Sequence, residues 1–153
     1  MRKRSDIMLE GYFDAAYADN QDQRSTGCYV FMYYSSPISW STKVQQVIAL
    51  YNCGAEYMAC TESAREVLWL CHLLSEVAEI EQGPTGIFGV NNGSNAIAKN
   101  PEFHLCTKHI EIWERFINAF VELGNIEIIH IPTDKMLANG MTKPLVQNKH
   151  NIY

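Results

Sequence analysis

The strongest constraint on the fold is a stretch near the start of the chain, residues 9–17, which reads Leu-Glu-Gly-Tyr-Phe-Asp-Ala-Ala-Tyr. Its aromatic and small residues predict a strand that is buried on both faces, with one carboxylate, Asp14, in its interior. A buried carboxylate is tolerated only when it is paired, hydrogen-bonded or bound to a metal. The simpler alternative is that Asp14 marks the strand end and points to water.

The composition is that of one folded domain, because 47% of the 153 residues are hydrophobic and 19% are charged. No apolar run is long enough to cross a bilayer, so no membrane partner is expected. Five cysteines without CxxC pairing indicate reduced thiols in an intracellular compartment, cytoplasmic or nuclear. The net charge of -5 gives no overall attraction to a phosphate backbone.

Five strands are predicted from β-rich runs between turn residues, over residues 9–17, 27–34, 38–42, 86–90 and 126–131. The first three follow one another on short connections and therefore form an antiparallel meander. The fourth is reached through a long helix, which implies parallel pairing. The pattern indicates an α/β fold with a mixed sheet and helices on its faces.

A long amphipathic helix is predicted over residues 52–80, because apolar residues recur at steps of three or four. The stripe consists of Cys60, Ala64, Val67, Cys71, Leu74 and Ala78. One turn earlier the stripe reaches Glu56, a second buried acid that would be aimed at the first strand. Alternatively, Glu56 sits in the first turn and favours the helix dipole. Shorter helices are predicted over residues 94–99, 109–123 (with Trp113, Ile117, Phe120 and Val121 on its apolar side) and 135–141.

Several short stretches resemble, in the same order, the ribonuclease H domain of Ty1/copia-type retrotransposon polyproteins. They are residues 11–17, 24–26, 29–31, 38–41, 55–59, 98–101, 107–110, 131–133 and 142–145. The resemblance implies a ribonuclease H-like domain over residues 9–146, with a tail or cut edge at 1–8 and a polar tail at 147–153. It also implies a five-stranded mixed sheet, the first three strands antiparallel and the rest parallel to the first, with helices on both faces.

In that family four carboxylates hold two divalent cations, magnesium or manganese, about 3.5–4 Å apart, and the RNA strand of an RNA–DNA hybrid is hydrolysed. The resemblance places the four acid positions on Asp14, Glu56, Val90 and Asn139. Valine offers no ligand atom, and asparagine keeps one neutral oxygen but loses a charge. We therefore expect weak or absent metal binding and little or no nuclease activity.

Other chemistry-bearing residues have less specific patterns. Asp19, Asp22 and Asp134 are read as solvated or capping residues, because replacing a missing acid would require a backbone shift. His104, Cys106 and His109 lack a fourth zinc ligand at a recognisable spacing. Basic residues nearest the expected active face are candidates for phosphate contact, or ordinary solvated charges: Lys99, Lys108, Arg115 and Lys143.

Three functions remain open from the residues alone. A non-catalytic module would bind an RNA–DNA hybrid or other nucleic acid in a salt-dependent manner. An active nuclease would cleave the hybrid with magnesium and lose activity in Asp14→Asn. An interaction domain would do neither and would bind a protein partner or itself. Separately, the resemblance implies the reverse transcriptase region of the same polyprotein as a partner in the family. Trp113 is read as core, whereas Trp69 lies off the buried stripe, so its exposure would indicate a partner surface.

Overall fold

The computed structural model describes residues 9–78, 83–90 and 108–142. The predicted tails and the predicted helix over residues 94–99 lie outside these described residues. Among the described residues, no helix is long and apolar enough to span a bilayer.

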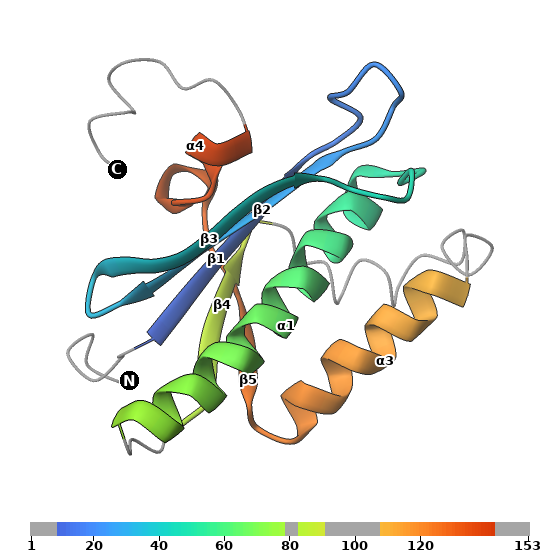
Figure 1. Cartoon of the computed structure of the whole chain (residues 1–153). Helices are drawn as coiled ribbons and strands as arrows, with labels where there is room; N and C mark the ends of the chain where they lie inside the picture. Colours follow the sequence, from blue (N-terminus) through green and yellow to red (C-terminus); the bar gives the residue numbers. More distant parts are fainter. Residues whose placement is uncertain (1–8, 79–82, 91–107, 143–153) are drawn as a thin grey trace.

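The fold is built on one five-stranded sheet in the order β3-β2-β1-β4-β5 (Figure 1). The strands are β1 (Leu9–Ala16), β2 (Thr26–Tyr33), β3 (Ser36–Val44), β4 (Thr85–Gly89) and β5 (Ile126–His130). β1 pairs antiparallel with β2 and β2 with β3, whereas β4 is parallel to β1 and β5 to β4. The predicted mixed sheet is therefore confirmed, and β1 is its central strand with all but one residue buried.

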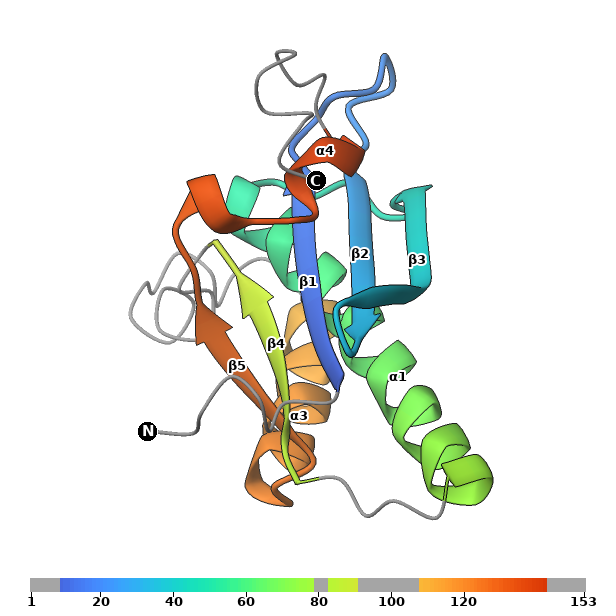
Figure 2. The ribbon, with the colours of Figure 1, turned by 90° about the vertical axis from the view of Figure 1, so that its left-hand side faces the viewer.

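Helices cover both faces of the sheet (Figures 1 and 2). α1 (Asn52–Ala78) and α3 (Lys108–Glu122) lie on one face, and a 3-10 turn, η3 (Thr133–Lys135), and the short α4 (Asn139–Thr142) lie on the other. The prediction of a single helix over residues 135–141 is wrong. Met136 adopts an extended backbone, with φ -79° and ψ 106°, and this interrupts the helix between η3 and α4.

Alternation along the strands divides the core into two apolar clusters, one on each face. The larger cluster joins α1 and α3 to the sheet and includes Phe13, Phe31, Val67, Ile87, Ile117 and Ile126. The smaller cluster lies under η3 and α4 and is formed by Tyr12, Cys28, Met136 and Ala138. Successive β1 residues therefore serve opposite clusters, and even-numbered Asp14 faces the α4 side.

The apolar side of α3 differs in one position from the prediction. Ile117 is buried and Trp113 and Phe120 pack against the larger cluster, as predicted. Val121, however, is 41% exposed, and Phe116 packs instead, with its ring 4.8 Å from that of Phe120. The prediction for Val121 is wrong because the helix is rotated so that the 113-116-117-120 stripe meets α1 and the sheet.

The close packing of β4 on β1 yields a stability prediction for Gly89. A Cβ atom at this position would overlap the Phe13 ring in the buried core, so Gly89→Ala should destabilise the fold by about 1–3 kcal/mol. Gly54 is the matched control, because its Cβ would meet the Cβ of Ala49 at 3.6 Å, and Gly→Ala within a helix should stabilise by about 0.5–1 kcal/mol. Urea unfolding measures both changes. Equal stability of Gly89→Ala and wild type would contradict this packing.

Candidate active site

Asp14 lies two residues before the end of β1 and is only 2% exposed. Its Oδ2 accepts a hydrogen bond from the Thr142 hydroxyl at 2.5 Å. Burial of Asp14 is thus confirmed, and the alternative in which it points to water is wrong. The desolvated carboxylate is stabilised by a donor from a segment 128 residues further along the chain.

The η3–α4 segment that carries Thr142 is anchored over β1 and β2. The Cys28 thiol donates to the carbonyl of Ala138 at 3.3 Å, and Cys28 is the register partner of Asp14 in the β1–β2 pair. Asn139 is buried, and its side-chain amide donates to the carbonyl of Thr133 at 2.7 Å. Because residues three apart in a helix share a side, Asn139 lies on the same side of α4 as Thr142.

Glu56 is the fifth residue of α1 and is 7% exposed. It is therefore a buried acid, as predicted, and not an exposed residue of the first turn. The start of α1 is tied to the sheet because the Gln45 side-chain amide, just beyond β3, donates to the Ala55 carbonyl at 2.8 Å. The pKa of the neighbouring Cys60 thiol is raised to about 12. Burial is the larger cause, and the negative charge of Glu56 is the second.

Val90 follows β4 and supplies no ligand atom. It is half-buried and packs in the smaller apolar cluster, whose partly buried members include Phe88, Ile131 and Leu137. The main chain is fixed there because the Ile131 amide donates to the Gly89 carbonyl at 2.9 Å. The side chains at the end of β4 are therefore apolar and provide no oxygen ligand.

The elements that carry all four positions meet at one end of the sheet. The ends of β1 and β4, the first turns of α1 and the α4 helix lie together there (Figures 1 and 2). The side chains on these elements are two carboxylates, one neutral amide and one alkyl group. Oxygen-rich coordination of two hard cations needs more negative charge than this, and no group of three or more His, Cys, Asp or Glu within the described residues could hold a metal ion. The residues do not fit a pair of divalent cations.

Asn139 retains one group that could face a cation or a ligand. Its Oδ1 is buried and has no hydrogen-bond partner among the described residues. An amide oxygen is a weaker ligand for a hard cation than a carboxylate, because it carries no charge. The site therefore keeps oxygen atoms but lacks the charge of a two-metal centre.

Of the three acids considered as replacements for the missing carboxylates, two interact with residues outside the site and the third is exposed. Asp19 accepts a hydrogen bond from the Thr26 hydroxyl at 2.7 Å. Asp22 forms an ion pair with Arg24 at 2.5 Å, and this partner lowers the pKa of the exposed Asp22 carboxyl. Asp134 is exposed in η3. All three are surface residues, as expected from the sequence.

Only part of the predicted basic surface is described. Arg115 is exposed on α3, and Lys108 is the first residue of that helix. The side chain of Lys108 lies outside the described residues, and so do Lys99 and Lys143. The same holds for the three possible zinc ligands, which are His104, Cys106 and the side chain of His109. Phosphate contact by these groups stays a prediction.

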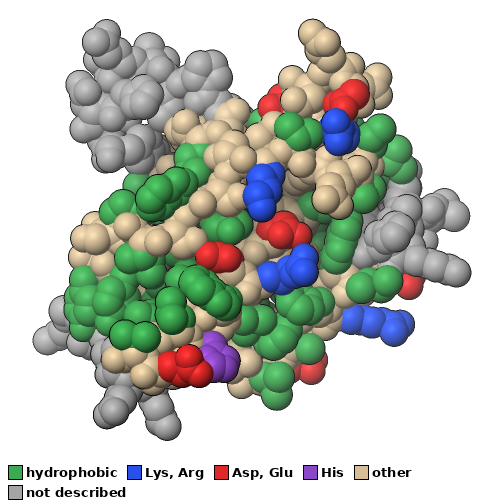
Figure 3. All heavy atoms as spheres, in the orientation of Figure 1, with side chains coloured by type: hydrophobic (Ala, Val, Ile, Leu, Met, Phe, Trp, Pro, Cys, Tyr) green, Lys and Arg blue, Asp and Glu red, His purple; other side chains and the backbone are tan. Residues whose placement is uncertain are grey.

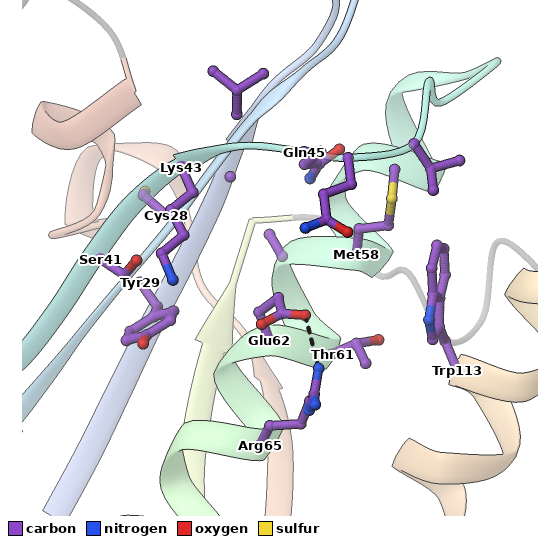
Figure 4. A pocket seen from close by; sticks show the side chains of 15 residues that line it. Cys28, Tyr29, Ser41, Lys43, Gln45, Met58, Thr61, Glu62, Arg65 and Trp113 are labelled. Atoms are coloured by element: carbon purple, nitrogen blue, oxygen red, sulfur yellow. Dashed lines mark hydrogen bonds and ion pairs between the residues drawn. The ribbon is translucent and has the colours of Figure 1, made fainter.

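A groove of about 440 Å³ lies on the opposite face from Asp14, between β3 and α1 (Figure 4). Lys43 reaches into it from β3, Met58 and Arg65 line it from α1, and the Trp113 ring closes it on the α3 side. Trp113, predicted as core, is half-buried and forms a groove wall. No local sequence pattern indicates this groove, because its walls come from four separate elements.

Comparison with known proteins identifies the fold and the family. No protein-family model matches the chain. The retrovirus-related Pol polyprotein from transposon RE1 of Arabidopsis thaliana is 35% identical over 146 residues, or 95% of this chain. The corresponding polyprotein from transposon TNT 1-94 of Nicotiana tabacum is 33% identical over 150 residues, or 97% of this chain. The chain belongs to the family of Ty1/copia-type Pol polyproteins.

The ribonuclease H fold of this domain is shown by solved structures as well. LC11 ribonuclease H1 in complex with an RNA/DNA hybrid has a TM-score of 0.60 at 14% identity, covering 88% of this chain and 92% of that chain. At that identity the likeness establishes the fold alone. This ribonuclease H-like domain spans only 10% of the RE1 polyprotein and 11% of the TNT 1-94 polyprotein.

The hydrogen bond between Thr142 and Asp14 yields a prediction for this site. Thr142→Val removes the hydroxyl but keeps the side-chain shape, so the buried carboxylate loses its donor and the protein should lose about 1–3 kcal/mol of stability. Thr142→Ser retains the hydroxyl and is the matched control, with a much smaller loss. Thermal and urea unfolding measure both variants. If Thr142→Val and Thr142→Ser had the same free energy of unfolding, the Thr142 hydroxyl would not be stabilising Asp14.

The raised thiol pKa near Glu56 gives a prediction at alkaline pH. The Cys60 pKa rises on folding from 9.0 to about 12. The contribution of the neutral thiol to the free energy of unfolding is therefore fully present below the pKa of the unfolded state and is lost as pH rises toward the pKa of the folded state. Burial raises the pKa of Tyr57 in the same direction. The free energy of unfolding should therefore fall above about pH 9, and less steeply in Cys60→Ala or Tyr57→Phe. An unchanged slope in both variants would contradict this linkage.

Proposed function

We propose that this domain is a ribonuclease H-like module that has kept the fold but does not cleave RNA–DNA hybrids. The observation that carries the proposal is the chemical character of the four acid positions. Two of them, Asp14 and Glu56, are buried carboxylates, whereas Val90 belongs to an apolar cluster and Asn139 is a neutral amide.

Electrostatics gives the physical reason for the loss. Two-metal hydrolysis depends on cations that stabilise both the attacking and the leaving oxygen, and those cations require negative ligands to replace their water. The four family positions together carry two negative charges here instead of four. We infer that magnesium or manganese binds weakly at most and that a bridged pair of cations does not form.

The partner is proposed to be an RNA–DNA hybrid bound without cleavage. Support comes from the fold shared with LC11 ribonuclease H1, which was solved with an RNA/DNA hybrid. Because the chain carries a net charge of -5, such binding would depend on a local basic surface, for which Arg115, Lys99, Lys108 and Lys143 are the candidates. Affinity should then fall steeply as salt increases.

The deciding experiment compares the natural chain with the double variant Val90→Asp plus Asn139→Asp on a labelled RNA–DNA hybrid. With magnesium or manganese, the natural chain should leave the hybrid intact and the double variant should cut it. Adding Asp14→Asn to the double variant should abolish the cleavage again. Cleavage by the natural chain that Asp14→Asn stops would overturn the proposal.

Metal binding supplies a second readout that does not depend on cleavage. In Asn139→Asp the amide that donates to Thr133 is replaced by a carboxylate, so the metal-free double variant should be less stable than the natural chain. Magnesium should recover that stability, because a ligand that binds only the folded state stabilises it by mass action. The natural chain should show little response. A folded double variant that neither responds to magnesium nor cuts would refute the role given to the missing charges.

Binding without cleavage is measured by fluorescence anisotropy of the same hybrid at low and physiological salt. Saturable binding that weakens with salt supports the nucleic-acid module. No binding at low salt would refute the RNA–DNA hybrid as the partner and would favour an interaction domain. The absence of cleavage is tested separately by the cleavage assay.

A further inference from the structure

The outer side of α1 carries an apolar stripe that the described part of the chain leaves exposed. Trp69 is 58% exposed, Leu73 is 37% exposed and Val77 is 75% exposed. Their spacing of four residues places them along one side of the helix. Trp69 lies opposite the buried Val67, and the line turns from there so that Val77 borders the buried side at Leu70. A tryptophan and two aliphatic residues in line, each more than one-third exposed, indicate a surface that binds another molecule.

The shape of the domain makes this stripe accessible. The second half of α1 projects beyond β3 at the edge of the molecule (Figure 2). The space-filling view shows hydrophobic side chains gathered over this part of α1 and the neighbouring β2–β3 hairpin (Figure 3). A flat or helical surface could therefore lie along α1 without meeting the sheet.

Charged side chains flank the stripe in an ordered way. Arg65 and Glu76 are eleven residues apart, which is about three helical turns and about 16 Å along the axis, so both lie on the same side of α1. Their side chains are 65% and 66% exposed, and each takes part in a local ion pair, with Glu62 and His72 respectively. The midpoint between Arg65 and Glu76 falls between Trp69 and Leu73.

This arrangement is complementary to itself. When two copies of α1 pack antiparallel about a two-fold axis through that midpoint, Arg65 of each copy faces Glu76 of the other, and Trp69 of each lies against Leu73 of the other. A parallel two-fold arrangement would instead place Glu76 against Glu76 and Arg65 against Arg65. Two further acids lie on this side of α1. Glu62 is 63% exposed and forms the ion pair with Arg65 of its own chain. Glu66 is half-buried and accepts a hydrogen bond from Ser39 on β3, so its carboxylate is directed toward its own sheet.

We propose that two copies of this chain associate through antiparallel packing of their α1 outer faces, centred on Trp69 and Leu73 and oriented by reciprocal Arg65–Glu76 ion pairs. The contact involves one helix face, which is smaller than the roughly 1,200–2,000 Å² of a standard stable interface. The association is therefore weak, with a Kd on the order of micromolar or above. It depends on the outer face of α1 and is independent of the acid site.

Sedimentation equilibrium of the full chain over a concentration series at about 0.15 M salt tests the proposal. The natural chain should show a reversible monomer–dimer equilibrium. Arg65→Glu and Glu76→Arg should each raise the Kd by about tenfold or more, because each reversal creates two like-charge contacts in a symmetric dimer. The double reversal Arg65→Glu plus Glu76→Arg should restore association. Trp69→Ala should abolish it.

Matched charge changes on α3 control for net charge. Arg115→Glu and Glu122→Arg are exposed α3 substitutions of the same kind and should leave the Kd unchanged. Circular dichroism checks that each variant is folded. A monomer at every concentration, or a double reversal that stays as weak as the single ones, would overturn the antiparallel α1 dimer. Capture of a different protein by the stripe, without self-association, would overturn it as well.

Discussion

The burial of one carboxylate in the central strand organises this domain. Asp14 lies in β1, which pairs on both edges and is covered on both faces, so water cannot solvate the charge. The Thr142 hydroxyl supplies the hydrogen bond that makes this burial tolerable. Because the donor comes from the far end of the described chain, the carboxylate also holds the η3–α4 segment on its face of the sheet.

Under the proposed function, the residues at the other two acid positions reduce repulsion in the same region. Four carboxylates gathered at one end of a sheet would repel one another unless cations were bound between them. Val90 instead adds to the apolar cluster beneath η3 and α4, and Asn139 hydrogen-bonds to the backbone of the segment that it stabilises. Under the proposed function, the site has exchanged cation binding for local packing, which explains how the fold can persist without its metals.

The long helix α1 has two apolar sides with different roles. Its inner side, with Val67 and Leu70, packs on the sheet and carries Glu56 into the interior, whereas its outer side exposes Trp69. A helix with apolar residues on both sides exceeds what one core requires. Its outer face and the acid site are far enough apart in the fold to change independently.

The sequence by itself determined the five strands, the antiparallel pairing of the first three, the extent of α1 to within two residues at its end, and the burial of both Asp14 and Glu56. These follow from local periodicity and from the cost of burying charge, which residues near in sequence are sufficient to reveal. The tertiary structure alone decided that Thr142 satisfies Asp14, that Phe116 rather than Val121 packs inward, and that Met136 divides the last helical segment. Each of these depends on how segments distant in the chain meet, and no local pattern records the rotation of a helix against its neighbours or the donor that reaches a carboxylate from 128 residues away.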